Sequence, residues 1–245
     1  MKFKYLSIFL LAGSSLLFGK CDANAYKLAN VYPQIKTCKN NYIIWKDGTK
    51  MLYDDGKRKN NFYQLLNNAD IQDMFHFRYP KGARGYGKAP AINHDPGRIR
   101  NEKFFRKMYG NSASEVRKHL VRVPWVKGTI LVTRVNGIDR KIRAVVADLK
   151  KLPKSYQKYL YPIGGTFKWR KIAGTKRLSV HSFGAAIDIN VKYSAYWRWN
   201  KGKYRYQNKI PLAIVKIFER HGFIWGGKWY HYDTMHFEYR PELLK

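Results

Sequence analysis

Two short runs of strictly alternating polar and apolar residues constrain the fold of this chain most. Residues 186–190 read AIDIN and residues 235–239 read MHFEY. Because successive side chains of a strand point to opposite faces of a sheet, this period predicts two half-buried strands. Asp188 lies on one face of the first strand, and His236 shares a face with Glu238 on the second. Each strand therefore presents a side chain that can bind a metal ion.

These strands and the residues just before them carry a ligand set suited to a catalytic zinc ion. His181 lies seven positions before Asp188, and Asp233 lies three positions before His236. Two imidazoles and one carboxylate can hold zinc and leave one coordination position open for water. A second carboxylate beside the last ligand can take a proton from that water. Gly184 would allow a bend between His181 and its strand. The pattern predicts a zinc hydrolase.

The same two segments resemble a known peptidase family at nearly every polar position. The patterns are Ser179-x-His181-x-x-Gly184-x-Ala186-x-Asp188 and Asp233-x-Met235-His236-Phe237. Together they resemble the signatures of the VanY-like D-alanyl-D-alanine carboxypeptidases. That group includes L-alanyl-D-glutamate endopeptidases and is related to the lysostaphin-type and hedgehog folds. The resemblance covers about residues 128–242 and implies a zinc peptidase that acts on the stem peptides of peptidoglycan.

The resemblance also implies a role for each matching residue. His181, Asp188 and His236 would hold one zinc ion. Asp233 would be the general base that takes a proton from the attacking water and delivers it to the leaving amine. Many relatives carry Glu at this position, so the base has a shorter side chain here. Arg170 matches the substrate-binding arginine of the family, and its guanidinium suits a carboxylate or a developing oxyanion.

Three further polar residues flank the predicted ligands. We expect Glu238 to accept a hydrogen bond from a ligand imidazole and so to orient it, although its place beside His236 also makes it an alternative base. Ser179 and His231 are expected to contact the substrate. His231 lies five residues before His236, but a fourth ligand would close the coordination position that a catalytic zinc site keeps open.

The beginning of the chain resembles an export signal. A short basic start precedes an apolar run at residues 5–18, which is too short to span a membrane as a helix. Cleavage after Ala25 fits the Ala-x-Ala pattern, and Gly19 offers a second position. The second position alone would keep Cys21, so that a disulfide with Cys38 could form in an oxidising compartment. We expect export to the periplasm, cell wall or extracellular space, with no transmembrane segment in the mature chain.

The charge of the chain indicates what it meets there. Lys and Arg total 48 against 16 Asp and Glu, a formal net charge of +32. Such a charge attracts polyanions. The basic residues are spread along the chain without a helix-turn-helix, zinc-finger or RNA-binding signature, so we do not expect nucleic acid as a partner. Peptidoglycan stem peptides, and anionic envelope polymers by charge, are the expected partners.

The remaining patterns predict an α+β fold. Residues 138–149 show the apolar spacing of a helix, and Pro211 suits the first turn of another. Residues 80–100 are rich in Pro and Gly and predict a long irregular loop, of a kind that often forms a lid or a substrate wall. We expect a small antiparallel sheet that carries the zinc ligands, flanked by helices, with an N-terminal extension. The predicted units are a signal peptide at 1–25, the extension with its loop at 26–127, and a zinc peptidase domain at 128–245.

Several activities are compatible with these patterns. Family members either trim a terminal D-alanine or cut internally between L-alanine and D-glutamate. We favour the first, because the guanidinium of Arg170 can bind a terminal carboxylate through two hydrogen bonds. Two non-catalytic alternatives are a pseudoenzyme that binds wall peptides and a basic protein that binds wall polymers and keeps the metal site for stability. The complete ligand set with its base argues against the pseudoenzyme.

Overall fold

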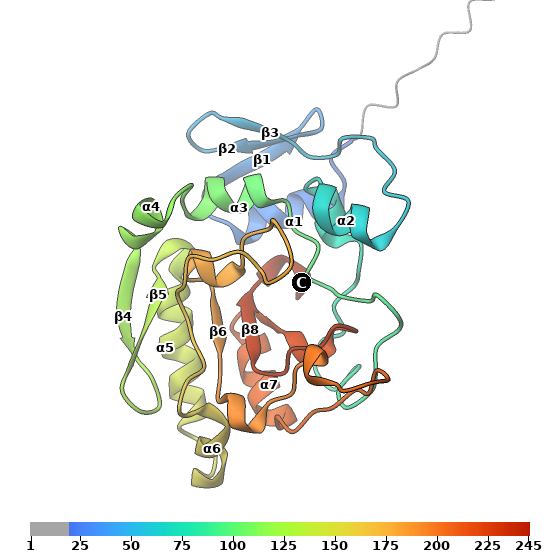
Figure 1. The fold of residues 1–245 in the computed structure, drawn as a ribbon. Coiled ribbons are helices and arrows are strands. Elements are labelled where there is room, and N and C mark those ends of the chain that lie inside the picture. The colour runs from blue at the N-terminus through green and yellow to red at the C-terminus, as the bar shows by residue number, and fades with distance from the viewer. Residues whose placement is uncertain (1–19) are drawn as a thin grey trace, which may run out of the picture.

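The computed structural model describes residues 20–245, which form an α+β fold as predicted (Figure 1). The helices are α1 (Ala23–Val31), α2 (Phe62–Asn68), α3 (Glu102–Tyr109), α4 (Ala113–Arg117), α5 (Ile138–Leu149), α6 (Gln157–Leu160) and α7 (Leu212–Arg220). The strands are β1 (Ile35–Lys39), β2 (Tyr42–Trp45), β3 (Lys50–Leu52), β4 (Leu120–Pro124), β5 (Thr129–Thr133), β6 (Ala186–Asp188), β7 (Phe223–Trp225) and β8 (His236–Tyr239). The apolar run expected to be the export signal lies outside the described residues.

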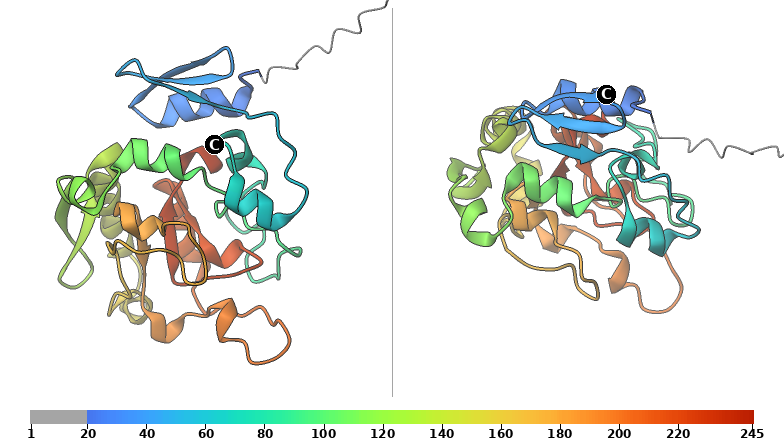
Figure 2. Two further views of the ribbon diagram at one scale, coloured as in Figure 1. Left: turned by 45° about the horizontal axis from the view of Figure 1, so that its top comes forward. Right: turned by 90° about the horizontal axis from the view of Figure 1, so that it is seen from above.

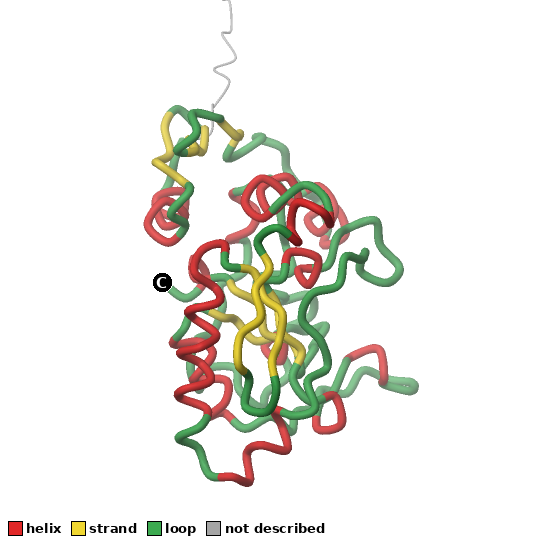
Figure 3. Tube along the Cα trace, turned by 90° about the vertical axis from the view of Figure 1, so that its left-hand side faces the viewer, coloured by secondary structure: helices red, strands yellow, loops and turns green. Residues whose placement is uncertain are grey.

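The strands form three small antiparallel sheets. Their orders are β1-β2-β3, β4-β5 and β6-β8-β7. The first sheet and α1 form a layer at one end of the molecule (Figure 2). The β4–β5 hairpin lies on one side, beside α5 (Figure 3), and the third sheet lies in the interior. The small antiparallel sheet expected to carry the zinc ligands is this third sheet.

The third sheet has one polar and one apolar face because its central strand alternates. Phe237 of β8 stacks on Phe218 of α7, with ring centroids 3.9 Å apart, so α7 covers the apolar face. On the other face Asp188 of β6 lies directly opposite His236 of β8. Neighbouring residues across an antiparallel pair bring their side chains together on one face. The two predicted strands and their facing are therefore confirmed.

Other local predictions are confirmed as well. The helix predicted at 138–149 is α5, and α7 follows Pro211 directly. Residues 80–100 contain neither helix nor strand. This irregular segment runs past the third sheet, where Gly97 packs closely against Ile224 of β7 with a φ of +101°. A side chain at that position would clash with Ile224, so the segment approaches the sheet through a glycine.

The N-terminal part of the chain packs into the same hydrophobic core as the rest. One continuous cluster of buried side chains runs from Ala25 to Tyr239. The hydroxyl of Tyr32 donates to Glu242 at 2.6 Å, and a disulfide joins Cys21 to Cys38. The proposed boundary between an extension and a peptidase domain stays a prediction, but the two parts share their core. Among residues 20–245 no helix is long and apolar enough to cross a membrane.

A buried ion pair attaches the irregular segment to α7 and to the turn after β7. The ammonium of Lys228 lies 2.6 Å from the carboxylate of Glu219, and both side chains are almost fully buried. Lys228 also donates to the carbonyls of Pro80 and Gly82, and Glu219 accepts from the hydroxyl of Tyr79. Burial lowers the pKa of Lys228, and the carboxylate of Glu219 opposes this by stabilising the ammonium.

We expect Lys228→Met to lower the free energy of unfolding by about 3–5 kcal/mol, because the carboxylate of Glu219 stays buried without its cation. Denaturant unfolding monitored by tryptophan fluorescence measures this. The matched control is Arg220→Met, since Arg220 is an exposed partner of Asp148 and should cost less than about 1 kcal/mol. Equal effects of the two substitutions would contradict the structural role of the buried pair.

Candidate metal centre and active site

Three side chains converge on the polar face of the third sheet. One ligand atom each of His181, Asp188 and His236 lies within 4.8 Å of the others. The Oδ1 atom of Asp188 is 3.1 Å from Nε2 of His181 and 3.0 Å from Nδ1 of His236, and these two nitrogens are 3.2 Å apart. A single ion can therefore be reached by all three groups. The pKa of Asp188 lies well below its usual range because, although burial opposes ionisation, both imidazoles favour the carboxylate.

The backbone before β6 presents His181 to this cluster. Residues Val180–Phe183 form a turn of 3-10 helix that ends at Gly184, which has a φ of +64°. This is the bend that the sequence predicts. The Nδ1 atom of His181 donates to the carbonyl of Thr166 at 2.6 Å. Because that nitrogen carries the proton, Nε2 faces the cluster with its lone pair, as a metal ligand requires.

The imidazole of His236 is oriented in the same way by Glu238. Its Nε2 atom donates to Glu238 at 3.1 Å, which leaves Nδ1 to face Asp188. Although burial opposes ionisation, Arg100 and His236 lower the pKa of Glu238 to about 2, and Arg240 adds to this effect. Glu238 lies on the side of the ring away from the cluster and is bound by cations. This geometry supports the role of a hydrogen-bond acceptor and not that of a general base.

Asp233 lies in the same pocket as the three ligand residues. Its Oδ1 atom is buried and has no hydrogen-bond partner among the described residues. Burial and the negative charge of Asp188 raise the pKa of Asp233 to about 7. A carboxylate with this pKa can both accept and return a proton near neutral pH. A buried oxygen without a partner beside a His-Asp-His cluster fits a site built for a divalent cation and its water.

Comparison with known proteins agrees with this geometry. Residues 173–239 match the family model of the D-alanyl-D-alanine carboxypeptidases. The resemblance read from the two motifs is thereby confirmed, and it supports a hydrolytic metallopeptidase. The match contains all three ligand residues and Asp233. No curated protein and no solved structure matches the chain.

Two further predicted site residues lie in the pocket with different surroundings. Arg170 lines the pocket and is exposed, while its backbone binds Ser182 of the turn that carries His181. Its side chain is thus available to a substrate. Ser179 is buried, and its hydroxyl accepts from the backbone amide of His181 at 3.4 Å. This bond caps the turn, so Ser179 also serves to position a ligand; its contact with a substrate stays a prediction.

Residues 95–100, which lie outside the matched segment, contribute to the site although no sequence motif predicts it. Arg98 and Arg100 both line the metal pocket beside Arg170. Arg98 is 2.9 Å from the buried carboxylate of Asp95, and Arg100 is 3.4 Å from Glu238. They come from the segment predicted as an irregular loop, of a kind that often forms a lid or a substrate wall. No local periodicity marks them, since their partners lie far away in the chain.

Asp95 also holds His231, the third histidine considered from the sequence. The Nδ1 atom of His231 donates to Asp95 at 2.6 Å, and the backbone amide of His231 donates to the same carboxylate at 3.0 Å. The imidazole is packed between the rings of Phe62 and Trp197. It lines the metal pocket but does not belong to the ligand cluster. This placement agrees with a flanking role and not with a fourth ligand.

We expect Asp95→Asn to lower kcat/KM about tenfold without loss of metal, because the imidazole of His231 loses a charge-assisted hydrogen bond. The loss should disappear in a His231→Gln background, since both substitutions would remove the same interaction. Steady-state kinetics of the four proteins, with metal analysis, measures this cycle. Independent, additive losses would show that Asp95 does not act through His231.

A second acidic group, Asp54, Asp55 and Asp70, has ligand atoms within 4.8 Å of one another. The ammonium of Lys59 is 2.6 Å from Asp55 and 3.0 Å from Asp70. It also lies 2.8 Å from Asp73. The lysine already supplies the positive charge that this cluster requires, so we assign no metal to it.

Proposed function

We propose that this protein is a zinc-dependent peptidase that hydrolyses the stem peptides of peptidoglycan, with D-alanyl-D-alanine carboxypeptidase as its leading activity. The observation that carries the proposal is the cluster of His181, Asp188 and His236, in which both imidazoles turn a lone pair toward Asp188. The buried carboxylate of Asp233 beside it supplies a proton acceptor. The family match within residues 173–239 supports the reaction class.

Each residue has a defined task in this proposal. The three clustered side chains would hold zinc, which when bound supplies a Lewis acid and lowers the pKa of water. Asp233 takes a proton from the attacking water and returns it to the leaving amine, a task for which its buried Oδ1 atom, without a hydrogen-bond partner among the described residues, is available. Glu238 fixes the ring of His236, and Arg170 binds a carboxylate or the oxyanion.

The geometry near the cluster supports carboxypeptidase action. The pocket around the ligands has a volume of about 120 Å³, and the guanidinium-bearing residues Arg100 and Arg170 are part of its lining. Such groups suit the free carboxylate at the end of a peptide. An open cleft of about 1550 Å³ adjoins the pocket and favours the alternative, an endopeptidase that admits a polymer and cuts between L-alanine and D-glutamate.

Purified pentapeptide muropeptides distinguish the two activities. The proposal expects release of free D-alanine, identified by mass spectrometry of the products. Release of an intact peptide that begins with D-glutamate, without free D-alanine, would replace the carboxypeptidase by the endopeptidase.

The Cys21–Cys38 disulfide constrains the position of signal cleavage and the compartment to which the protein is exported. Cleavage after Ala25 would remove Cys21 and part of α1, whereas cleavage after Gly19 would keep the Cys21–Cys38 disulfide. We therefore propose cleavage near Gly19 and an oxidising compartment of the envelope as the location. N-terminal sequencing of the mature protein tests this proposal.

A basic protein that binds wall polymers is the main non-catalytic alternative, and the net charge of +32 is the observation in its favour. It predicts that removal of zinc lowers the melting temperature but leaves polymer binding unchanged. A pseudoenzyme would contain zinc and bind wall peptides without turnover. Measurement of zinc content together with turnover separates both from the peptidase.

A further inference from the structure

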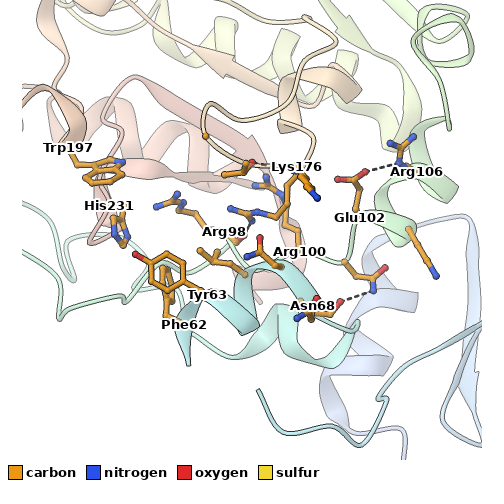
Figure 4. A pocket seen from close by; sticks show the side chains of 18 of the residues that line it. Phe62, Tyr63, Asn68, Arg98, Arg100, Glu102, Arg106, Lys176, Trp197 and His231 are labelled. Atoms are coloured by element: carbon orange, nitrogen blue, oxygen red, sulfur yellow. Dashed lines mark hydrogen bonds and ion pairs between the residues drawn. The ribbon is translucent and has the colours of Figure 1, made fainter. Parts of the chain in front are cut away.

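A large cleft adjoins the metal pocket of the candidate site. It has a volume of about 1550 Å³ and shares Arg98, Arg100, Trp197 and His231 with the metal pocket. Figure 4 shows the guanidinium groups of Arg98 and Arg100 between the aromatic pair Phe62 and Tyr63 and the loop that carries Lys176. A peptide that reaches the metal cluster can therefore continue into this cleft.

Positive charge dominates the walls of the cleft. The basic residues include Arg98, Arg100, Lys103, Lys176, Arg177 and Arg198. Glu102 is the acidic residue of this lining, and its carboxylate is already used: it pairs with Arg106 at 2.9 Å and accepts from the backbone amide of Leu178 at 2.8 Å. The carboxylate of Glu102 therefore does little to neutralise the other positive side chains of the cleft.

Arg177 is a half-buried cation of this lining. It donates to the carbonyl of Arg98 at 3.1 Å, but its Nε atom is buried without a hydrogen-bond partner, and it forms no ion pair within residues 20–245. Burial and the positive charges of Arg100 and Arg98 lower the pKa of Arg177 to about 9. A half-buried guanidinium among other cations gains free energy when an anion binds.

We propose that this cleft is a carboxylate-binding subsite, in which Arg177 and Arg98 bind a carboxylate of the peptide substrate that does not belong to the bond being cut. The inference rests on the proposed function, because the continuity of the cleft with the metal pocket makes the substrate itself the occupant. The α-carboxylate of D-glutamate in the stem is the group we assign to it. An anionic wall polymer bound across the cleft is the other outcome that the test separates.

Two stem pentapeptides that differ in one group test the subsite. In one the α-carboxylate of D-glutamate is free, and in the other it is amidated. Binding is measured by calorimetry with the mature zinc-loaded protein carrying Asp233→Asn, so that the peptides stay intact. We expect the free carboxylate to bind about tenfold more tightly, as for the loss of one charge-assisted hydrogen bond. The additional substitution Arg177→Gln should abolish this preference.

Two variants control for folding and for general charge. Arg177→Lys keeps the charge but cannot form paired hydrogen bonds, so part of the preference should remain. Arg143→Gln removes the same charge from an exposed position of α5 that lines neither cavity, and the preference should be unchanged. Melting temperature and zinc content verify that each protein is folded.

Equal affinity for the two peptides, or a preference that persists without the Arg177 guanidinium, would overturn the subsite. Arg177-dependent binding of a polyphosphate chain, with no binding of either peptide, would assign the cleft to a polymer instead. Turnover by the protein with Asp233 intact reports separately on the proposed function. Selective binding without turnover would therefore keep the subsite and reject the peptidase.

Discussion

Asp233→Asn should lower turnover of a stem peptide by about 10²–10⁴-fold while the zinc content stays near one per chain. The substitution keeps the shape of the side chain but removes its ability to accept a proton. In the structure this carboxylate is not part of the ligand cluster, and within residues 20–245 its Oδ1 atom has no hydrogen-bond partner to lose. Product release per unit time and elemental analysis of the same preparation measure both quantities.

A matched substitution separates this role from a general effect of charge in the pocket. Glu238→Gln should weaken metal binding or activity by about 10–100-fold, as for other groups that orient a ligand histidine.

Near-normal turnover by Asp233→Asn would move the base to another carboxylate. Loss of zinc from that variant would make Asp233 a ligand.

His236→Ala should lose both the metal and the activity. Its imidazole is one of the three proposed ligands among residues 20–245 and lies opposite Asp188, so we expect the remaining pair to hold zinc without useful affinity. We expect zinc content to fall from about one per chain to near zero after dialysis. The matched control His231→Ala should keep its zinc, because His231 is bound to Asp95 outside the cluster.

Full zinc occupancy in His236→Ala would contradict the ligand set, and His231 would then be the first substitute to examine. Loss of zinc in both variants would indicate that the pocket collapses. Circular dichroism and the melting temperature of each variant distinguish that outcome from the loss of a ligand.

The sequence predicted that His181, Asp188 and His236 lie together because the features that place them are local. Alternation at residues 186–190 and 235–239 places Asp188 and His236 on one sheet face, and Gly184 permits the bend after His181. These features depend on neighbouring residues only. The helix at α5 was predicted for the same reason, since its apolar spacing is regular and long.

The remainder of the site depends on contacts that no local pattern records. Asp95 binds His231 across 136 positions of sequence, and Arg100 meets Glu238 across 138. These residues lie in an irregular segment, where neither period of two nor period of 3.6 applies. β7 was also not predicted, because its three residues, Phe223–Trp225, are all buried and show no alternation. The contacts of Asp95 and Arg100 and the formation of β7 both depend on how the whole chain packs.

Digestion of purified sacculi by the mature protein tests the central claim most directly. The protein is assayed as purified, after removal of metal with a chelator, and after zinc is restored, and the products are identified by mass spectrometry. We predict that stem peptides lose D-alanine, or are cut internally, in the first and third samples and stay intact in the second. Stem peptides that remain intact in all three samples, or that are cut equally well without metal, would contradict a zinc peptidase.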